Sequence, residues 1–435
     1  MDFSAEYKKK SGTAAEITAE IKSGDRIFTC GEPSALLKTL YDRREQYKNV
    51  KLYGMGLSAN KSHGILNPEM NGHVDFHISY GMRGEYVAHQ NGRNIGYCAA
   101  HMSEMEALIK QGIHPDYLMA QATPMDADGY FTFGVRPLGG RASVDAGARV
   151  LLQVNKCLPN VPTNYNRVHI SEVYGVCESE EPMMQIPDLE PSEIEKKMAA
   201  FIVERIPDEA TLQLGFGGVP NAVGTFLENH KDLGLHTELF TTSMVKLMKL
   251  GVINNSKKTL EPGKTVFGFC SGNQEMFDYM DGNPCIEARC ISWINHYDNI
   301  SRNRRMVSIN SCIGVDLKGQ VCSETIGLVH YSGTGGQMDF VRGARMAEEG
   351  QSFIAMPSVQ VRRTGERISK ITLTLAQGSA VTTTRNDVDK IVTEYGVAEL
   401  LYKSDCEKAK AFIAVAHPDF RDQLTFEAKK AGIIY

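Results

Sequence analysis

Short apolar runs rich in β-branched and aromatic residues alternate with stretches of helical spacing along most of the chain. Residues 24–31 (GDRIFTCG) predict a strand, residues 34–49 a helix, and residues 50–56 the next strand. Strands that alternate with helices form mainly parallel sheets, whose sites lie at the carboxyl ends of the strands. We therefore predict an α/β fold. Further buried strands are predicted in the segments ARVLLQVN, ATLQLGFGG, TVFGFCSG, ARCISWIN and SFIAMPS.

One segment between the strand–helix repeats is typical of an exposed connector. Residues 177–193 (CESEEPMMQIPDLEPSE) combine three prolines with many acidic residues. Ser192 and Glu195 then form a capping-box pattern, which predicts that a helix begins there. A chain of 435 residues is also too long for one typical core. We predict two domains, 1–185 and 186–435, whose similar lengths suggest a distant internal duplication.

A glycine-rich turn follows the strand predicted at TLQLG. Residues 212–224 (LQLGFGGVPNAVG) predict a strand, a turn and a helix, with Pro220 near the first helical position. The amides of such a turn can bind a phosphate or hold a carbonyl oxygen that becomes negative. A plain tight turn fits this short pattern equally well.

Glu238 follows this turn by about twenty residues, in the stretch LGLHTELFTTS. Thr241, Thr242 or Ser243 could cap the next helix, so we expect Glu238 at a strand end or turn that faces a crevice. Most glutamates are solvated surface residues. The apolar flanking residues favour a buried carboxylate here. Burying a carboxylate costs free energy, so a functional role would account for it.

Other segments carry further candidate residues. A second glycine-rich stretch, residues 330–346 (HYSGTGGQMDFVRGARM), would expose more amides, and its Asp339 and Arg342 have the spacing of a helical pair. His417, before Pro418, is interpreted as a histidine satisfied at a helix end rather than a catalytic one.

Taken together, these segments resemble the acetyl-CoA hydrolase/transferase family, the class I CoA-transferases with a catalytic glutamate. The similarity is dense from residue 212 onward and includes LQLGFGGVPNAV, LGLHTEL, SGTGGQMDFVRGA, IAMPS, VTTTRNDVD, VTEYGVAEL and AHPDF in the family's order. Within the family, the segments are most similar to the 4-hydroxybutyrate and butyrate:acetate CoA-transferases. The resemblance implies two open, mainly parallel α/β domains with the active site between them.

The resemblance also implies a mechanism. Glu238 would attack an acyl-CoA thioester, and CoA would pass to an acid such as acetate through a glutamyl-CoA thioester with ping-pong kinetics. Asn310 is a further substrate-site candidate. CoA would be a substrate and part of the covalent intermediate, with no permanently bound cofactor. The oxyanion and CoA donors implied are Gly215, Phe216, Gly217, Gly218, Val219, Gly333, Gly335 and Gly336.

Composition and charge limit the classes of binding partner that we expect for this protein. The net charge of −5 gives no general attraction to nucleic acid or to anionic membranes. The N-terminus lacks the apolar core of a secretory signal, and ten scattered cysteines indicate reduced thiols, so we expect a cytoplasmic protein. His73 and His77 have helical spacing but no third ligand, so no metal site is predicted. The family implies a homodimer or a higher homo-oligomer.

Three other functions remain open from the sequence. A short-chain acyl-CoA hydrolase would pass the acyl group to water rather than to an acid. A nucleotide-binding regulatory protein would use the glycine turn for phosphate and form no covalent intermediate. A catalytically dead subunit would supply only an interface, which the intact Glu238 segment argues against.

Overall fold

The structure, a computed structural model, describes residues 3–57, 62–186, 190–215 and 217–435. The chain forms two compact units. Two short later segments join the first unit, so the units do not follow one cut in the sequence, and the division into 1–185 and 186–435 stays a prediction. The first unit comprises Met1–Ile186, Val266–Ile294 and Tyr331–Gly335, and the second comprises Pro187–Thr265, Asn295–His330 and Gly336–Tyr435.

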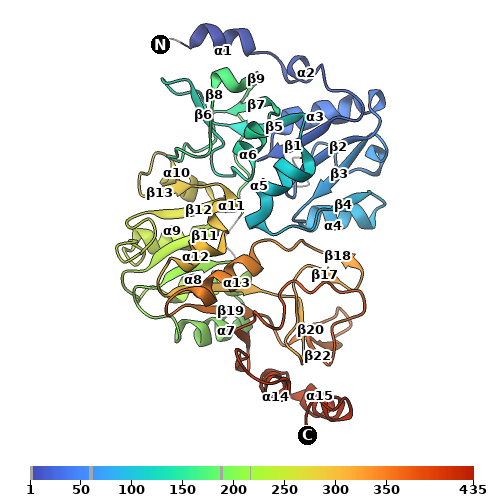
Figure 1. Cartoon of the computed structure of the whole chain (residues 1–435), viewed down its shortest axis with the longest axis vertical. Coiled ribbons are helices and arrows are strands. Elements are labelled where there is room, and N and C mark those ends of the chain that lie inside the picture. The colour runs from blue at the N-terminus through green and yellow to red at the C-terminus, as the bar shows by residue number, and fades with distance from the viewer. Residues whose placement is uncertain (1–2, 58–61, 187–189, 216) are drawn as a thin grey trace. The chain divides into compact units, whose positions relative to one another are not determined.

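A seven-stranded parallel sheet forms the centre of the first unit (Figure 1). Its strands lie in the order β4-β3-β2-β1-β5-β7-β9, and every neighbouring pair is parallel. Parallel neighbours need a crossover connection, which is why helices separate the strands in sequence. The strands are β1 (Arg26–Cys30), β2 (Val50–Gly54), β3 (Val74–Ile78), β4 (Ile95–Tyr97), β5 (Tyr117–Ala122), β7 (Arg149–Asn155) and β9 (Val173–Ser179). The α-helices described between residues 3 and 186 are α1 (Ser4–Lys10), α2 (Ala14–Ile17), α3 (Ser34–Asp42), α4 (Arg83–Gln90), α5 (Met105–Ala107) and α6 (Gly140–Asp145), and β6 (Tyr130–Thr132) pairs with β8 (Arg167–His169).

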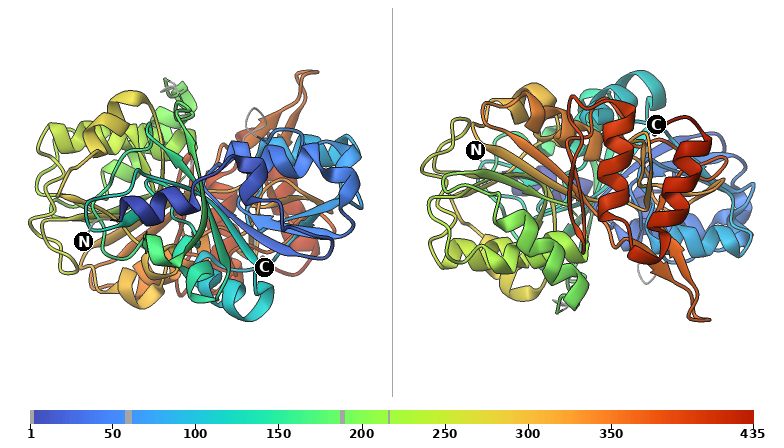
Figure 2. Two further views of the ribbon diagram at one scale, coloured as in Figure 1. Left: turned by 90° about the horizontal axis from the view of Figure 1, so that it is seen from above. Right: turned by 90° about the horizontal axis from the view of Figure 1, so that it is seen from below.

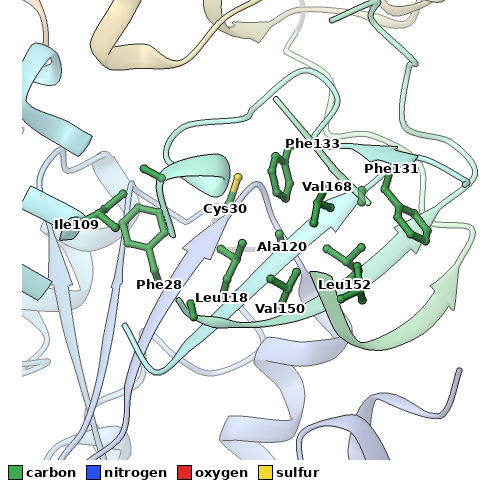
Figure 3. Close-up of a cluster of buried hydrophobic side chains, with 14 of the residues drawn as sticks. Phe28, Cys30, Ile109, Leu118, Ala120, Phe131, Phe133, Val150, Leu152 and Val168 are labelled. Carbon is green, nitrogen blue, oxygen red and sulfur yellow. The ribbon is translucent and has the colours of Figure 1, made fainter. Parts of the chain in front are cut away.

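Apolar side chains on one face of this sheet form a buried core (Figure 3). Phe28 and Cys30 of β1 lie beside Leu118 and Ala120 of β5, and all four are at most 2% exposed. Residues two apart in a strand point to the same face, so these alternate positions create one continuous apolar surface. Burial of that surface is the main favourable contribution to the stability of the unit.

Six strands of the second unit lie side by side in the order β11-β10-β14-β19-β23-β24. The first five are parallel to their neighbours, and only β24 is antiparallel to β23. The strands are β10 (Thr211–Leu214), β11 (Gly234–Thr241), β14 (Met306–Ser311), β19 (Gln351–Ala355), β23 (Lys390–Thr393) and β24 (Gly396–Glu399). The helices are α7 (Glu193–Val203), α8 (Gly218–Phe226), α9 (Thr242–Lys249), α12 (Tyr297–Ser301), α13 (Gln337–Met346), α14 (Asp405–Val415) and α15 (Pro418–Lys430), of which the last two lie side by side (Figure 2).

The same strand order occurs in both units. In the first, β2-β1-β5-β7-β9 are neighbours, and in the second β11-β10-β14-β19-β23 are neighbours. In each unit the first of these strands, β1 or β10, has the next strand, β2 or β11, on one side. A later strand, β5 or β14, lies on its other side. The point at which the direction reverses is where open parallel sheets bind ligands. It lies between β10 and β14 in the second unit, and the shared order agrees with the suggested internal duplication.

The predicted mainly parallel α/β architecture is confirmed, with one wrong element and with a helix, predicted over residues 34–49, that ends at Asp42. ARCISWIN was predicted as a strand, but β13 (Ile286–Ala288) ends at its first residue and α11 (Ile291–Ile294) is helical. The predicted capping box is confirmed, because Ser192 accepts from the Glu195 amide and Glu195 accepts from the Ser192 amide. Over the described ranges, no helix is both long and apolar enough to cross a membrane.

The remaining elements include β12 (Thr265–Ser271), α10 (Gln274–Met280), β15 (Gly314–Asp316), β16 (Val321–Cys322), β17 (Thr325–Ile326), β18 (Val329–His330), β20 (Val359–Val361), β21 (Arg367–Ser369) and β22 (Ile371–Thr372).

Candidate active site

Glu238 lies inside a strand, which corrects the prediction of a strand end or turn. Strand β11 continues to Thr241. Its neighbour β10 is shorter and pairs Leu212 with Leu235. Continuing this register places Glu238 opposite Gly215, the residue after β10 ends. Glu238 therefore lies at the carboxyl edge of β10, although its own strand continues past it.

Asn310 lies in the same row of the sheet. Leu214 of β10 pairs with Ile309 of β14, so Asn310 also stands opposite Gly215. The amides of Asn310 and Gln213 hydrogen-bond to each other at 3.2 and 3.3 Å, and both side chains are buried. This pair joins the strand ends at the switch point between β10 and β14. Direct contact of Asn310 with a substrate stays a prediction.

The Glu238 carboxylate is held by one side chain and one close backbone. Asn295 Nδ2 donates a hydrogen bond to Glu238 Oε2. A Cβ added to Gly336 would lie 1.8 Å from that oxygen and 1.9 Å from Asn295 Nδ2, so position 336 accepts only glycine while this pair is in place. Gly336 is also the N-cap residue of α13. The first-turn amides of α13, which have no partner within the helix, and the positive end of the helix dipole thus lie next to the carboxylate.

The surroundings of Glu238 raise its pKa to about 7 from the usual 4.5. Burial is the main cause, because a charged carboxylate loses hydration there. The Asn295 hydrogen bond lowers this pKa, and the negative charge of Asp339 raises it. Glu238 as a whole residue is half-buried. Near neutral pH, the residue is balanced between a neutral acid and a nucleophilic anion.

The glycine turn supplies fewer donors than the sequence predicted. The Gly215 N–H donates to the Ile309 carbonyl at 2.8 Å, so the sheet uses this amide and it is not free for an oxyanion. Gly217 has a φ of +125°, a conformation that favours glycine. Gly218 and Val219 then form the first turn of α8, whose amides have no partner within the helix. Phe216 lies outside the described residues.

The second glycine-rich segment divides between the two units. Gly333 and Gly335 belong to the first unit, and Gly336 belongs to the second. A Cβ on Gly333 would lie 2.2 Å from the Ser79 carbonyl oxygen, and one on Gly335 would lie 3.1 Å from the Tyr80 ring. Both glycines therefore allow close packing against the residues after β3. Their role as CoA or oxyanion donors stays a prediction.

Two residues of the site were not recognised as such from the sequence. Asn295 is the last residue of the segment ARCISWIN, which was wrongly predicted to be a strand, and it belongs to no recognised motif. Asp339 was expected to pair with Arg342, but Arg342 forms an ion pair with Asp387 at 3.3 Å, while Asp339 lies 3.5 Å from Asn295 Nδ2. No local sequence signal could have found either contact, because the fold brings these residues together.

His417 has the structural role expected for it. It is the N-cap residue of α15, and its Nδ1 accepts a hydrogen bond from the Asp419 amide at 3.2 Å. The interpretation as a satisfied histidine at a helix end is confirmed.

Comparison with known proteins identifies the class to which this fold belongs. The acetyl-CoA hydrolase/transferase N-terminal domain matches residues 1–187, and the C-terminal domain of that family matches residues 272–428. These matches, with the parallel α/β fold, indicate an enzyme of the CoA-transferase class. The chain belongs to the acetyl-CoA hydrolase/transferase family.

Individual relatives match this chain over nearly its full length. The chain is 36% identical to a 4-hydroxybutyrate coenzyme A transferase of Clostridium kluyveri, covering 99% of this chain and 100% of the relative. It is 34% identical to a butyryl-CoA:acetate CoA-transferase of Anaerostipes caccae, covering 100% and 99%. The crystal structure of RipA from Yersinia pestis superimposes with a TM-score of 0.92 at 34% identity, and each chain is covered completely.

Proposed function

We propose that this enzyme exchanges CoA between a short-chain acyl-CoA, butyryl- or 4-hydroxybutyryl-CoA, and a carboxylic acid such as acetate. The observation that carries the proposal is the Glu238 carboxylate, held by Asn295 against a glycine at the N-terminus of α13. The names of the full-length relatives support the choice of acyl groups.

Covalent catalysis by Glu238 accounts for the exchange without a general base. A Glu238 oxygen attacks the thioester carbonyl carbon, the carbon–sulfur bond breaks, and CoA leaves as a thiolate. This step gives a mixed anhydride of Glu238 and the acyl group. The thiolate then attacks the glutamyl carbonyl carbon and releases the acid as a carboxylate, which leaves a glutamyl-CoA thioester. A second acid reverses these steps and departs as the new acyl-CoA, so the kinetics are ping-pong.

The raised pKa of Glu238 suits this role. A carboxylate surrounded by strong donors is a weak nucleophile, whereas a pKa near the working pH combines basicity with a useful ionised fraction. Amides at the α8 turn and around Gly336 are the proposed donors to the oxyanion. Loss of one such donor typically costs roughly 3–4 kcal/mol of transition-state stabilisation. CoA acts here as a substrate, and no permanently bound cofactor takes part.

The test is to incubate the protein with acyl-CoA alone, digest it and analyse the peptides by mass spectrometry. We expect CoA, or a hydroxylamine-trapped product, on the peptide that contains Glu238. Glu238→Gln should abolish both the adduct and the exchange while CoA binding remains. Glu204→Gln is the matched control, because Glu204 is an exposed glutamate at the end of α7. Exchange without any adduct on Glu238, or turnover by Glu238→Gln, would refute the mechanism.

The same experiment separates the alternatives. A hydrolase forms a covalent intermediate but releases free acid and CoA at the same rate with and without acetate. A nucleotide-binding regulatory protein forms no adduct. A homodimer or higher homo-oligomer and a cytoplasmic location stay predictions.

A further inference from the structure

The amide of Asn295 lies between two carboxylates. Its Nδ2 donates to Glu238 Oε2 and lies 3.5 Å from Asp339 Oδ2. Asn295 is fully buried and Asp339 is 5% exposed. The two carboxylates fix the orientation of the amide, because its oxygen would be repelled by either. Among the described residues, Asn295 Oδ1 has no hydrogen-bond partner, so the nitrogen carries the contacts of this side chain.

Asp339 is placed to act on Asn295. It lies in the first turn of α13, three residues after Gly336, and is buried on that helix. Asn295 Nδ2 lies 3.5 Å from Asp339 Oδ2, which is beyond the usual hydrogen-bond range, whereas it donates a hydrogen bond to Glu238 Oε2. In the free enzyme, the amide therefore binds mainly to Glu238, with Asp339 as a second acceptor within reach.

The other charged groups around α13 are engaged elsewhere or face solvent. Arg342 and Arg345 of the same helix form ion pairs with Asp387. Helix α12, β14 and β19 pack against α13, and the two strands carry no ionisable side chain. Other ionisable groups on neighbouring elements include Tyr297 and Asp298 of α12, which are 38% and 63% exposed, and His236 of β11, whose Nδ1 lies 3.3 Å from Asn303 Nδ2.

We propose that Asp339 is a positioning residue that accepts the Asn295 amide when Glu238 is converted to its covalent intermediate. This inference rests on the proposed function. When Glu238 forms the anhydride or the thioester, it loses its negative charge, and its hydrogen bond to Asn295 weakens. Asp339 keeps its charge and becomes the stronger acceptor, since hydrogen bonds to ionised groups are roughly twice as strong as neutral ones. The amide shifts toward Asp339, and no buried donor is left unsatisfied while Glu238 is acylated.

Two substitutions separate the charge of Asp339 from its shape. Asp339→Asn keeps an oxygen that can accept from Asn295 but removes the charge, and Asp339→Ala removes both. Formation of the glutamyl-CoA adduct is measured in single turnovers from pH 5 to pH 9. At pH 8, we expect the rate to fall about tenfold in Asp339→Asn and further in Asp339→Ala, with the KM for acyl-CoA within twofold of the wild type.

The pH profile gives a readout that a purely structural role would not change. The charge of Asp339 raises the pKa of Glu238, so its removal lowers that pKa. The acid limb of the Asp339→Asn profile should therefore move to lower pH. Asp387→Asn is the matched control, because it removes a buried carboxylate that contacts α13 at Arg342 and Arg345. This control should leave the acid limb in place.

A double-variant cycle tests whether Asp339 acts through Asn295. In an Asn295→Ala background, Asp339→Asn should have no further effect on the rate at pH 8. Additive effects, an unchanged profile in Asp339→Asn, or equal changes in Asp339→Asn and Asp387→Asn would overturn the inference. If Asp339→Asn does not fold, Asp339→Glu keeps the charge and should retain the wild-type acid limb; a shifted limb there would contradict the proposal. Absence of any wild-type adduct on Glu238 would refute the proposed function itself.

Discussion

Substitution of Gly336 by alanine should slow the reaction of Glu238 with acyl-CoA, although the Glu238 side chain itself is unchanged. Gly336 has no unusual backbone conformation that would require glycine, because its φ is −100°. The requirement is steric: the new Cβ would lie 1.8 Å from Glu238 Oε2 and 1.9 Å from Asn295 Nδ2. Both atoms must move to accommodate one methyl group.

The size of the effect follows from these distances. Non-bonded heavy atoms approach to about 3.5 Å, so the carboxylate and the amide must each move by roughly 1.5 Å. A misplacement of about 1 Å can lower the rate of a well-positioned reaction by roughly a hundredfold. We therefore expect Gly336→Ala to form the Glu238 adduct at least about a hundred times more slowly. Overpacking should also lower the free energy of unfolding by about 1–3 kcal/mol.

The assay is single-turnover adduct formation, with thermal unfolding measured on the same samples. Gly112→Ala is the matched control, because its Cβ would meet only Leu108 Cδ1 at an ordinary 3.4 Å. Combining Gly336→Ala with Glu238→Ala should recover part of the lost stability, since one of the two clashing groups is gone. The reasoning is wrong if Gly336→Ala forms the adduct within about threefold of the wild-type rate.

Three further predictions concern stability. The pKa of Glu238 is 4.5 in the unfolded chain and about 7 in the folded protein, so between these pH values the folded state binds more protons than the unfolded state. The free energy of unfolding therefore falls, by on the order of 3 kcal/mol, as the pH rises from the lower value to the higher one. Glu238→Gln should lack this loss, and denaturant unfolding at pH 5 and pH 8 checks it; parallel changes in both proteins would contradict it. Ser192→Ala should lower the unfolding free energy by about 1 kcal/mol through loss of the α7 capping box, visible as a lower Tm. Gly218→Ala should be destabilising because its Cβ would lie 1.6 Å from Glu195 Oε1, and the same substitution should cost less in a Glu195→Ala background; an equal cost in both backgrounds would refute this clash.

The fold was largely predictable because its elements have clear local patterns. Strands such as β1 and β10 are short apolar runs ended by glycine, and α7 begins at a complete capping box. The error at ARCISWIN has a physical reason. A short apolar run has the same appearance in a buried strand and in a buried helical turn, and its length did not separate the two.

The candidate site was predictable only in part. The position of Glu238 after a glycine turn, with the ordered family segments, indicated a nucleophile. Its exact place was missed because β11 continues beyond β10, and strand length depends on pairing rather than on local pattern. Asn295 is 57 residues away from Glu238 along the chain, and its contact with Glu238 arises only from the tertiary fold. The involvement of the Gly215 amide in the sheet is likewise a matter of register, which the turn sequence does not show.

Opposing effects on Glu238 explain why its donor is an asparagine. Burial and Asp339 raise the pKa of Glu238, while Asn295 lowers it. The N-terminus of α13, at Gly336, also favours the anion. A lysine or arginine in place of Asn295 would pair with the carboxylate, lower its pKa and weaken it as a nucleophile. A neutral amide orients the carboxylate with a smaller loss of basicity, and the resulting pKa near 7 keeps the ionised form both populated and reactive at neutral pH.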